Sequence, residues 1–132
     1  MANATAITVT ALTANGAGVA QPTADVLDTG TAAVSLDADV GGRSDLVVLE
    51  VKNTAGAANN LTVSVLAGDN PPAFRAGLGQ LDTVIAQNAT SIIGPFESGR
   101  FIQDNGKLSV TFTPAAGTIG ANIRCYKLPK VA

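Results

Sequence analysis

Hydrophobic and polar residues follow their most regular pattern in the middle of the chain, at residues 46–52 and 61–67. The first stretch opens with four consecutive apolar residues before alternation begins, which is typical of a central strand covered on both faces at one end. The second stretch alternates with a period of two, which predicts a strand with one face on the core. We expect these strands to be partners, joined by a mobile loop at residues 53–60, because that loop is long and its side chains are small.

Weaker alternation predicts further strands on both sides of this centre. Residues 5–13 alternate apolar residues with threonine and predict a half-buried strand. A short strand is expected at residues 31–36, and two more at residues 83–87 and 91–93, separated by a turn. The chain therefore contains many short strands at regular spacing.

The clearest turn signal is Asn105-Gly106, within residues 99–113. These two residues tolerate the positive φ angles of a type I′ turn, so the sequence predicts a hairpin closed by a two-residue loop. The register of that hairpin would place Ile102 opposite Ser109 and gather the apolar side chains on one face.

The last predicted strand covers residues 118–128, where alternation is strict. Ile119, Ile123 and Cys125 share the face that we expect to point inward, while Arg124 and Tyr126 share the outward face. Cys125 is the only cysteine, and a thiol in this phase of the strand is expected to pack as a small hydrophobe.

Eight or nine short strands without a convincing helix or βαβ alternation predict an all-β fold. We expect residues 1–132 to form a single domain, an antiparallel two-sheet β-sandwich, with the jelly roll as one form of it. Residues 1–4 are expected to be a flexible N-terminal arm. A chain of 132 residues is long enough to bury a core of its own without disulfides.

The net charge of −2 gives no basic surface for phosphates, so we do not expect nucleic-acid binding. The charge is uneven along the chain, because six acids and one base in residues 1–50 give −5, and four acids and seven bases in residues 51–132 give +3. This pattern is either solvated surface or an acidic patch that faces a basic patch on a neighbouring subunit. No signal peptide and no apolar run long enough for a bilayer are found, so neither export nor membrane anchoring is expected.

The sequence contains no histidine, which excludes Ser/His/Asp and Cys/His arrangements and any metal site built on imidazole. No Ser-x-x-Lys spacing occurs either. We therefore predict no catalytic residue, no cofactor and no enzymatic activity.

Acidic residues gather in the first half of the chain, at Asp25, Asp28, Asp37, Asp39 and Asp45. Carboxylates at the spacing Asp37-x-Asp39 offer hard oxygen ligands of the kind that calcium takes. The spacing does not match an EF-hand loop, and Asp and Gly are common turn formers. The prediction is therefore turns and no metal site, with calcium as the alternative.

The longest segment without a strand pattern covers residues 68–81. Long loops in compact domains are usually functional or disordered, and a short helical turn is expected after Pro72. The candidates for a partner interface are the prolines and the bulky residues of this loop, Pro71, Pro72, Phe74 and Arg75. Aromatic and arginine residues are enriched at interface hot spots, although Phe74 could equally pack back over the sheet.

Several stretches together resemble the decoration proteins of tailed-bacteriophage capsids, also called cement or head auxiliary proteins. These stretches are residues 1–5, 46–52, 92–97, 107–112 and 126–129. The resemblance implies a non-enzymatic structural protein, made in the host cytoplasm and carried on the capsid surface of the virion. It also implies binding to the major capsid protein, clamping of neighbouring capsid subunits and a homo-oligomeric state, a trimer or dimer.

Two other functions remain open at this point. One is a carbohydrate-binding or adhesive β-sandwich module, against which the absence of tryptophan and the single tyrosine weigh. The other is a different virion part, such as a minor capsid or tail component.

Overall fold

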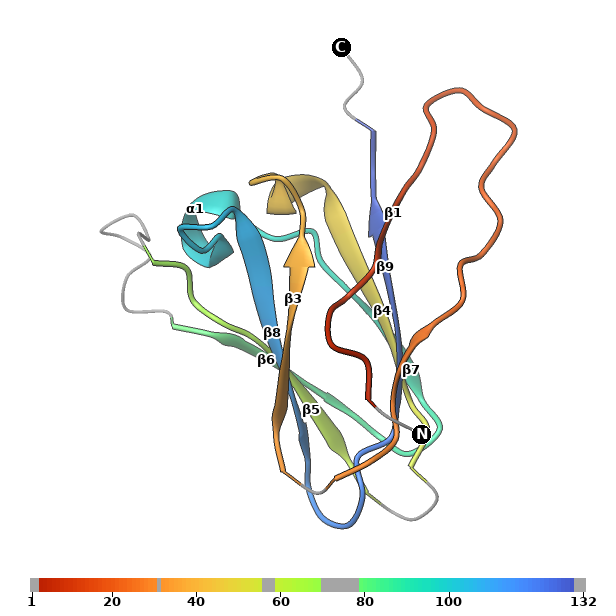
Figure 1. The fold of residues 1–132 in the computed structure, drawn as a ribbon, viewed down its shortest axis with the longest axis vertical. Helices are drawn as coiled ribbons and strands as arrows, with labels where there is room; N and C mark the ends of the chain where they lie inside the picture. Colours follow the sequence, from red (N-terminus) through yellow and green to blue (C-terminus); the bar gives the residue numbers. More distant parts are fainter. Residues whose placement is uncertain (1–2, 31, 56–58, 70–78, 130–132) are drawn as a thin grey trace.

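Two β-sheets face each other in the computed structural model, which describes residues 3–30, 32–55, 59–69 and 79–129 (Figure 1). One sheet has five strands and the other has four. Apolar side chains from both sheets form one core, whose largest fully buried members include Phe96, Phe112, Leu27 and Leu49. The fold is therefore mostly β and sandwich-like. Within the described ranges, no helix is long and apolar enough to cross a membrane.

The five-stranded sheet has the order β1-β9-β4-β7, and β2 also pairs with β9. Its strands are β1 (Val9–Ala11), β2 (Asp25–Leu27), β4 (Val47–Asn53), β7 (Thr90–Ile93) and β9 (Ala121–Lys127). β4 lies between β9 and β7, which confirms the prediction of a central strand. The inward residues predicted for the last strand are also confirmed, because Ile119, Ile123 and Cys125 are all buried.

β1 and β2 lie one after the other along the same edge of β9. Val9 lies opposite Cys125 in a parallel pairing, and Asp25 lies opposite Ile123 in an antiparallel one. The sheet is therefore mixed, and the prediction of a purely antiparallel sandwich is wrong for this strand. The predicted strand at residues 5–13 is also divided, because Ile7 bridges the four-stranded sheet before β1 reaches β9.

The four-stranded sheet is antiparallel, with the order β3-β8-β5-β6. Its strands are β3 (Val34–Asp39), β5 (Leu61–Val65), β6 (Leu81–Ile85) and β8 (Lys107–Pro114). The two central strands predicted as partners, β4 and β5, therefore belong to different sheets, and that pairing prediction is wrong. The connection between them crosses from one sheet to the other, which the length of the loop allows as readily as a hairpin. The jelly-roll form stays a prediction.

The predicted hairpin at residues 99–113 begins with a helical turn in place of its first strand. This turn is α1 (Ser98–Phe101), whose last residue donates its backbone N–H to the carbonyl of Glu97 at 3.1 Å. Phe101 is buried in the core. The Phe101 ring therefore reaches the core from a helical turn. The sequence pattern is compatible with a strand as well, because either element can bury this side chain.

The turn of this hairpin has three residues in its loop, one more than predicted. The N–H of Gly106 bonds the carbonyl of Gln103 at 2.9 Å, and Gly106 has a φ of 78°. Asn105 is not among the residues with positive φ, so this is a type I turn followed by a bulge at the glycine. Ile102 pairs with Leu108 and not with Ser109, so the predicted register is wrong by one position.

The N-terminal residues that the structure describes are tied to β2. The N–H of Ala4 donates to the carbonyl of Val26 at 2.9 Å, and the side chain of Asn3 accepts hydrogen bonds from the backbone of Asp28 and Thr29. Residues 1–2 of the predicted flexible arm lie outside the described residues.

Candidate functional site

One end of the sandwich carries most of the irregular structure, and we call it the α1 end. It consists of the 3-10 turn η1 (Ser44–Leu46), α1, the turn at residues 103–106 and the adjoining residues 66–69 and 79–80. In Figure 1 these segments lie in the upper part and along the left side, whereas residues 86–89 and 115–120 lie toward the bottom. The two loops that flank β5, at residues 53–60 and 68–81, are close in the sequence but leave from opposite ends of the sandwich. Residues 53–55 and 59–60 lie at the opposite end from α1, and residues 56–58 of the loop predicted to be mobile lie outside the described residues.

The four predicted interface residues, Pro71, Pro72, Phe74 and Arg75, lie outside the described residues, as does the expected helical turn after Pro72. The described chain on both sides of them is attached to the α1 end. The N–H of Gly68 donates to the carbonyl of Arg100 at 2.7 Å.

Further contacts hold these flanking residues. The guanidinium of Arg100 contacts the carbonyl of Gly79 at 3.4 Å, and the N–H of Asp104 donates to the carboxylate of Asp69 at 2.6 Å. The predicted interface loop thus begins and ends on the α1 end.

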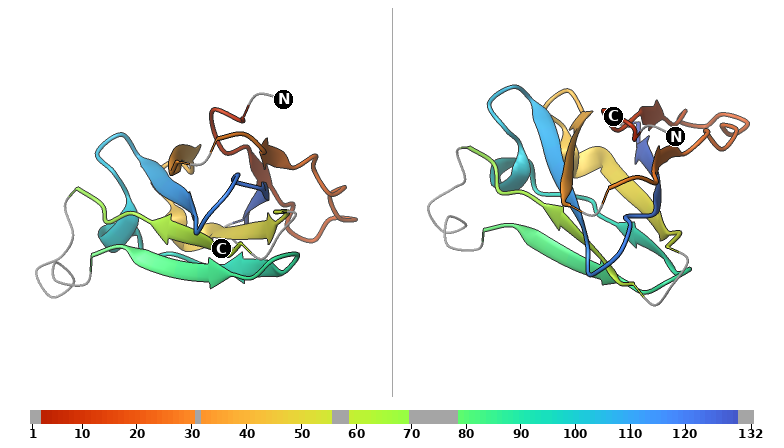
Figure 2. Two further views of the ribbon diagram at one scale, coloured as in Figure 1. Left: turned by 90° about the horizontal axis from the view of Figure 1, so that it is seen from below. Right: turned by 60° about the horizontal axis from the view of Figure 1, so that its bottom comes forward.

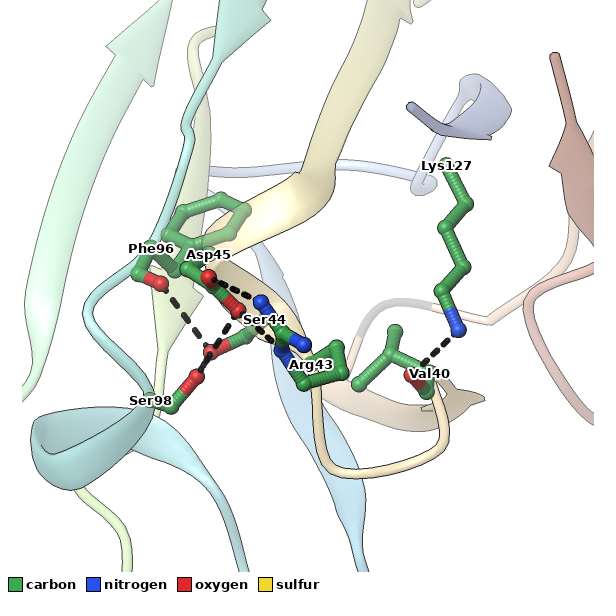
Figure 3. Close-up of polar contacts among 7 residues, drawn as sticks. All are labelled: Val40, Arg43, Ser44, Asp45, Phe96, Ser98 and Lys127. Atoms are coloured by element: carbon green, nitrogen blue, oxygen red, sulfur yellow. Dashed lines mark hydrogen bonds and ion pairs between the residues drawn. The ribbon is translucent and has the colours of Figure 1, made fainter. Parts of the chain in front are cut away.

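A reciprocal pair of hydrogen bonds docks η1 onto the segment before α1 (Figure 3). The hydroxyl of the buried Ser44 donates to the carbonyl of Phe96 at 3.0 Å, and the N–H of Phe96 donates to the carbonyl of Ser44 at 3.1 Å. Phe96 is itself buried and packs edge-on against Phe101, with ring centroids 5.8 Å apart and an interplanar angle of 80°. The guanidinium of Arg100 covers the Phe101 ring at 4.6 Å. The α1 end is therefore fixed by both polar and aromatic contacts.

Arg43 and Asp45 form a two-point ion pair at the surface of this end. The Nε and Nη2 atoms of Arg43 donate to the two carboxylate oxygens of Asp45 at 3.0 and 2.9 Å, a fork geometry that fixes both side chains. The hydroxyl of Ser98 also donates to Asp45 at 3.3 Å. The hydrogen bond from Arg43, followed by its charge, lowers the pKa of Asp45 to about 2. The side chains of Arg43 and Asp45 remain 43% and 45% exposed.

The polar groups of the α1 end are already engaged with one another. Asp45 is a poor general base, because its low pKa and its ion pair both disfavour protonation. The Ser98 hydroxyl donates a hydrogen bond to that carboxylate, and the buried Ser44 hydroxyl donates one to a backbone carbonyl. A chain without histidine offers no imidazole to activate either hydroxyl. The α1 end therefore presents a set of polar groups in fixed positions.

The acidic residues considered as calcium ligands do not gather at one site. Asp25 accepts hydrogen bonds from the backbone and hydroxyl of Thr8 at 2.6 and 3.0 Å, and Asp45 is engaged with Arg43. Asp37 and Asp39 both lie on the exposed face of β3. In the part of the chain that the structure describes, no three His, Cys, Asp or Glu side chains are grouped so that they could hold a metal ion.

The uneven charge of the two halves of the chain is partly neutralised within the fold. Glu50 and Arg124, one from each half, form an ion pair of 3.5 Å across β4 and β9. Asp39 likewise lies opposite Lys107 across β3 and β8. The hypothesis of complementary patches on neighbouring subunits stays a prediction.

Two exposed features were not foreseen from the sequence. Residues 13–21, between β1 and β2, form nine consecutive exposed positions without a charge, in a loop that projects from the body of the molecule (Figure 2). Ile92 of β7 leaves 72% of its surface exposed. The sequence did contain a signal for the exposure of Ile92. Neighbouring side chains of a strand face opposite sides of the sheet, so Ile92 and Ile93 cannot both face the core.

Comparisons of this chain with family models, curated proteins and solved structures find no significant match. The fold and the site define a mostly β, sandwich-like protein with an ordered group of polar side chains at one end.

Proposed function

We propose that this protein is a capsid decoration protein of a tailed bacteriophage. It binds the outer surface of the capsid, contacts the major capsid protein and stabilises the lattice without catalysing a reaction. In this role it works as a homo-oligomer, is made in the host cytoplasm and remains on the virion surface.

The observation that carries the proposal is the preorganised contact surface of the α1 end. Arg43, Asp45 and Ser98 hold one another in place, and Ser44 locks η1 onto Phe96. Groups that are already ordered lose little conformational entropy on binding. Modest affinity at each contact is enough for a protein that binds a repeating lattice, because linked contacts multiply it. Arginine is also among the residues enriched at interface hot spots.

The proposal is tested by co-sedimentation with expanded capsids, assembled from the major capsid protein encoded in the same genome. The protein is expected to sediment with the capsids and to raise their melting temperature. Retention on glycans together with failure to bind capsids would instead favour an adhesive module.

A pair of charge reversals locates the contact. Arg43→Glu breaks the ion pair at the α1 end and is expected to reduce capsid binding at least tenfold, a loss of about 1.4 kcal/mol. Lys52→Glu makes the same change of charge at an exposed position near the far end of β4 and serves as the control. Capsid binding by Arg43→Glu at the level of the control would place the contact elsewhere on the molecule.

A further inference from the structure

The outer face of the five-stranded sheet carries a band of apolar side chains around one ion pair. Ile92 of β7 lies opposite Glu50 of β4, which lies opposite Arg124 of β9, so the three side chains form one row across the sheet. In the next row, Val48 lies opposite Tyr126. We call these five residues the outer-face patch.

The apolar side chains of this patch are left partly or largely uncovered by the rest of the chain. Ile92 is 72% exposed, and Val48 and Tyr126 are each partly exposed. Leu128 extends the patch at the end of β9, where its N–H continues the ladder to the carbonyl of Leu46 at 2.7 Å, and it too is exposed. The apolar run that opens β4 predicts a strand covered on both faces at this point, yet only its inner face lies in the core. Contiguous exposed apolar side chains of this kind mark interaction surfaces.

The charges of the patch favour one particular occupant. Glu50 and Arg124 lie side by side at 3.5 Å, and their side chains are only 22% and 23% exposed. A two-fold axis through the patch would place Arg124 of a second copy over Glu50 of the first, and the reverse. The acid of each copy then faces the base of the other, so the surface is complementary to itself. An isologous contact, in which both copies use the same surface, requires this complementarity.

The loop at residues 13–21 borders the same face. The Nε atom of Arg124 donates to the carbonyl of Pro22 at 2.9 Å, which fixes the root of the loop beside the patch. The loop itself is exposed and uncharged. Charged residues are depleted in the cores of protein interfaces, so this loop extends the uncharged surface available to a partner.

From these contacts we infer that two copies of this chain associate through their outer-face patches, related by a two-fold axis. Ile92 supplies the main apolar contact, and Glu50 and Arg124 set the register between the copies. This inference does not rest on the proposed function, because it is argued from the outer face of the five-stranded sheet and not from Arg43, Asp45 and Ser98.

Sedimentation velocity and light scattering on the full chain test the inference. The wild type is expected to be a dimer, and Ile92→Asp a folded monomer with at least a hundredfold weaker self-association. Val84→Asp is the matched control, because Val84 is 61% exposed on β6 of the other sheet, and it is expected to remain dimeric. A monomeric or trimeric wild type overturns the inference, as does equal behaviour of the two variants.

Charge reversal gives an independent test that does not depend on Ile92. Glu50→Arg and Arg124→Glu each place two like charges in the patch, so each variant alone is expected to be monomeric. An equimolar mixture of the two is expected to form heterodimers, since opposite charges then meet across the axis. Circular dichroism establishes that each variant is folded. Folded variants that stay monomeric when mixed, or that dimerise alone, contradict the inference.

Discussion

The side chain of Asn53 donates a hydrogen bond of 2.9 Å to the backbone carbonyl of Ile85 and so joins the two sheets. Asn53 ends β4 in the five-stranded sheet, and Ile85 ends β6 in the four-stranded sheet. The same amide nitrogen donates to the carbonyl of Asn59 at 2.7 Å, and its oxygen accepts the N–H of Ala55 at 3.0 Å. One buried amide therefore fixes the end of the sandwich that lies opposite α1.

Replacing this amide is expected to destabilise the fold. Asn53→Ala leaves two carbonyl groups and one N–H without their partner in a buried place, and unpaired buried groups cost about 1–3 kcal/mol each. Because water can enter part of the space, we expect the free energy of unfolding in urea to fall by about 2–4 kcal/mol. Asn122→Ala, on the outer face of β9, is the control and is expected to change it by less than about 0.5 kcal/mol. Equal effects of the two variants would contradict this role for Asn53.

The thiol of Cys125 is expected to be unreactive in the folded protein. Burial, with a smaller contribution from the charge of Asp25, raises the pKa of Cys125 from 9.0 to about 12. At pH 8 the nucleophilic thiolate is therefore scarce, and reagents also lack access. A chromogenic thiol reagent is expected to label the native chain at least a hundredfold more slowly than the chain in denaturant. Rapid labelling under native conditions would show that β9 opens.

The ion pair of Asp45 gives the protein a defined response to acid. Because the folded pKa of about 2 lies below the ordinary value of 3.8, the pair stabilises the fold fully above pH 4. This contribution is lost as the pH falls from 4 to 2. Melting temperatures of the wild type and Asp45→Asn are expected to differ at pH 7 and to converge near pH 2. A difference that does not depend on pH would contradict the assignment.

Gly68 is expected to tolerate no side chain. A Cβ atom there would collide with the backbone of Ile102, including its nitrogen at 3.0 Å, and with the backbone of Phe101 at 3.0 Å. Gly68→Ala is therefore expected to lower the free energy of unfolding by about 1–3 kcal/mol, the range of overpacking. Gly16→Ala is the control, because its Cβ would meet the Thr13 side chain at 3.0 Å in an exposed loop that has room to shift, and no backbone atom closer than 3.8 Å. Proteolysis at the α1 end is expected to increase in the first variant alone.

Sequence patterns predicted those features that depend on neighbouring residues. The strict alternation of residues 118–128 identified the buried face of β9, because successive side chains of a strand point to opposite sides. The Asn105-Gly106 pair identified a turn, but such a pair suits both a two-residue loop and a three-residue loop with a glycine bulge. The structure adopts the second, with Gly106 at positive φ.

The sequence by itself determined the β class, the positions of most strands and which side of them is buried, since these follow from local alternation. Only the tertiary structure decided that β4 and β5 belong to different sheets, that β1 runs parallel to β9 and that η1 meets α1. Pairing joins residues far apart in the chain, and a period of two is satisfied equally by many partners and by either strand direction. The competition among those pairings is settled by packing of the whole core, which no local pattern contains.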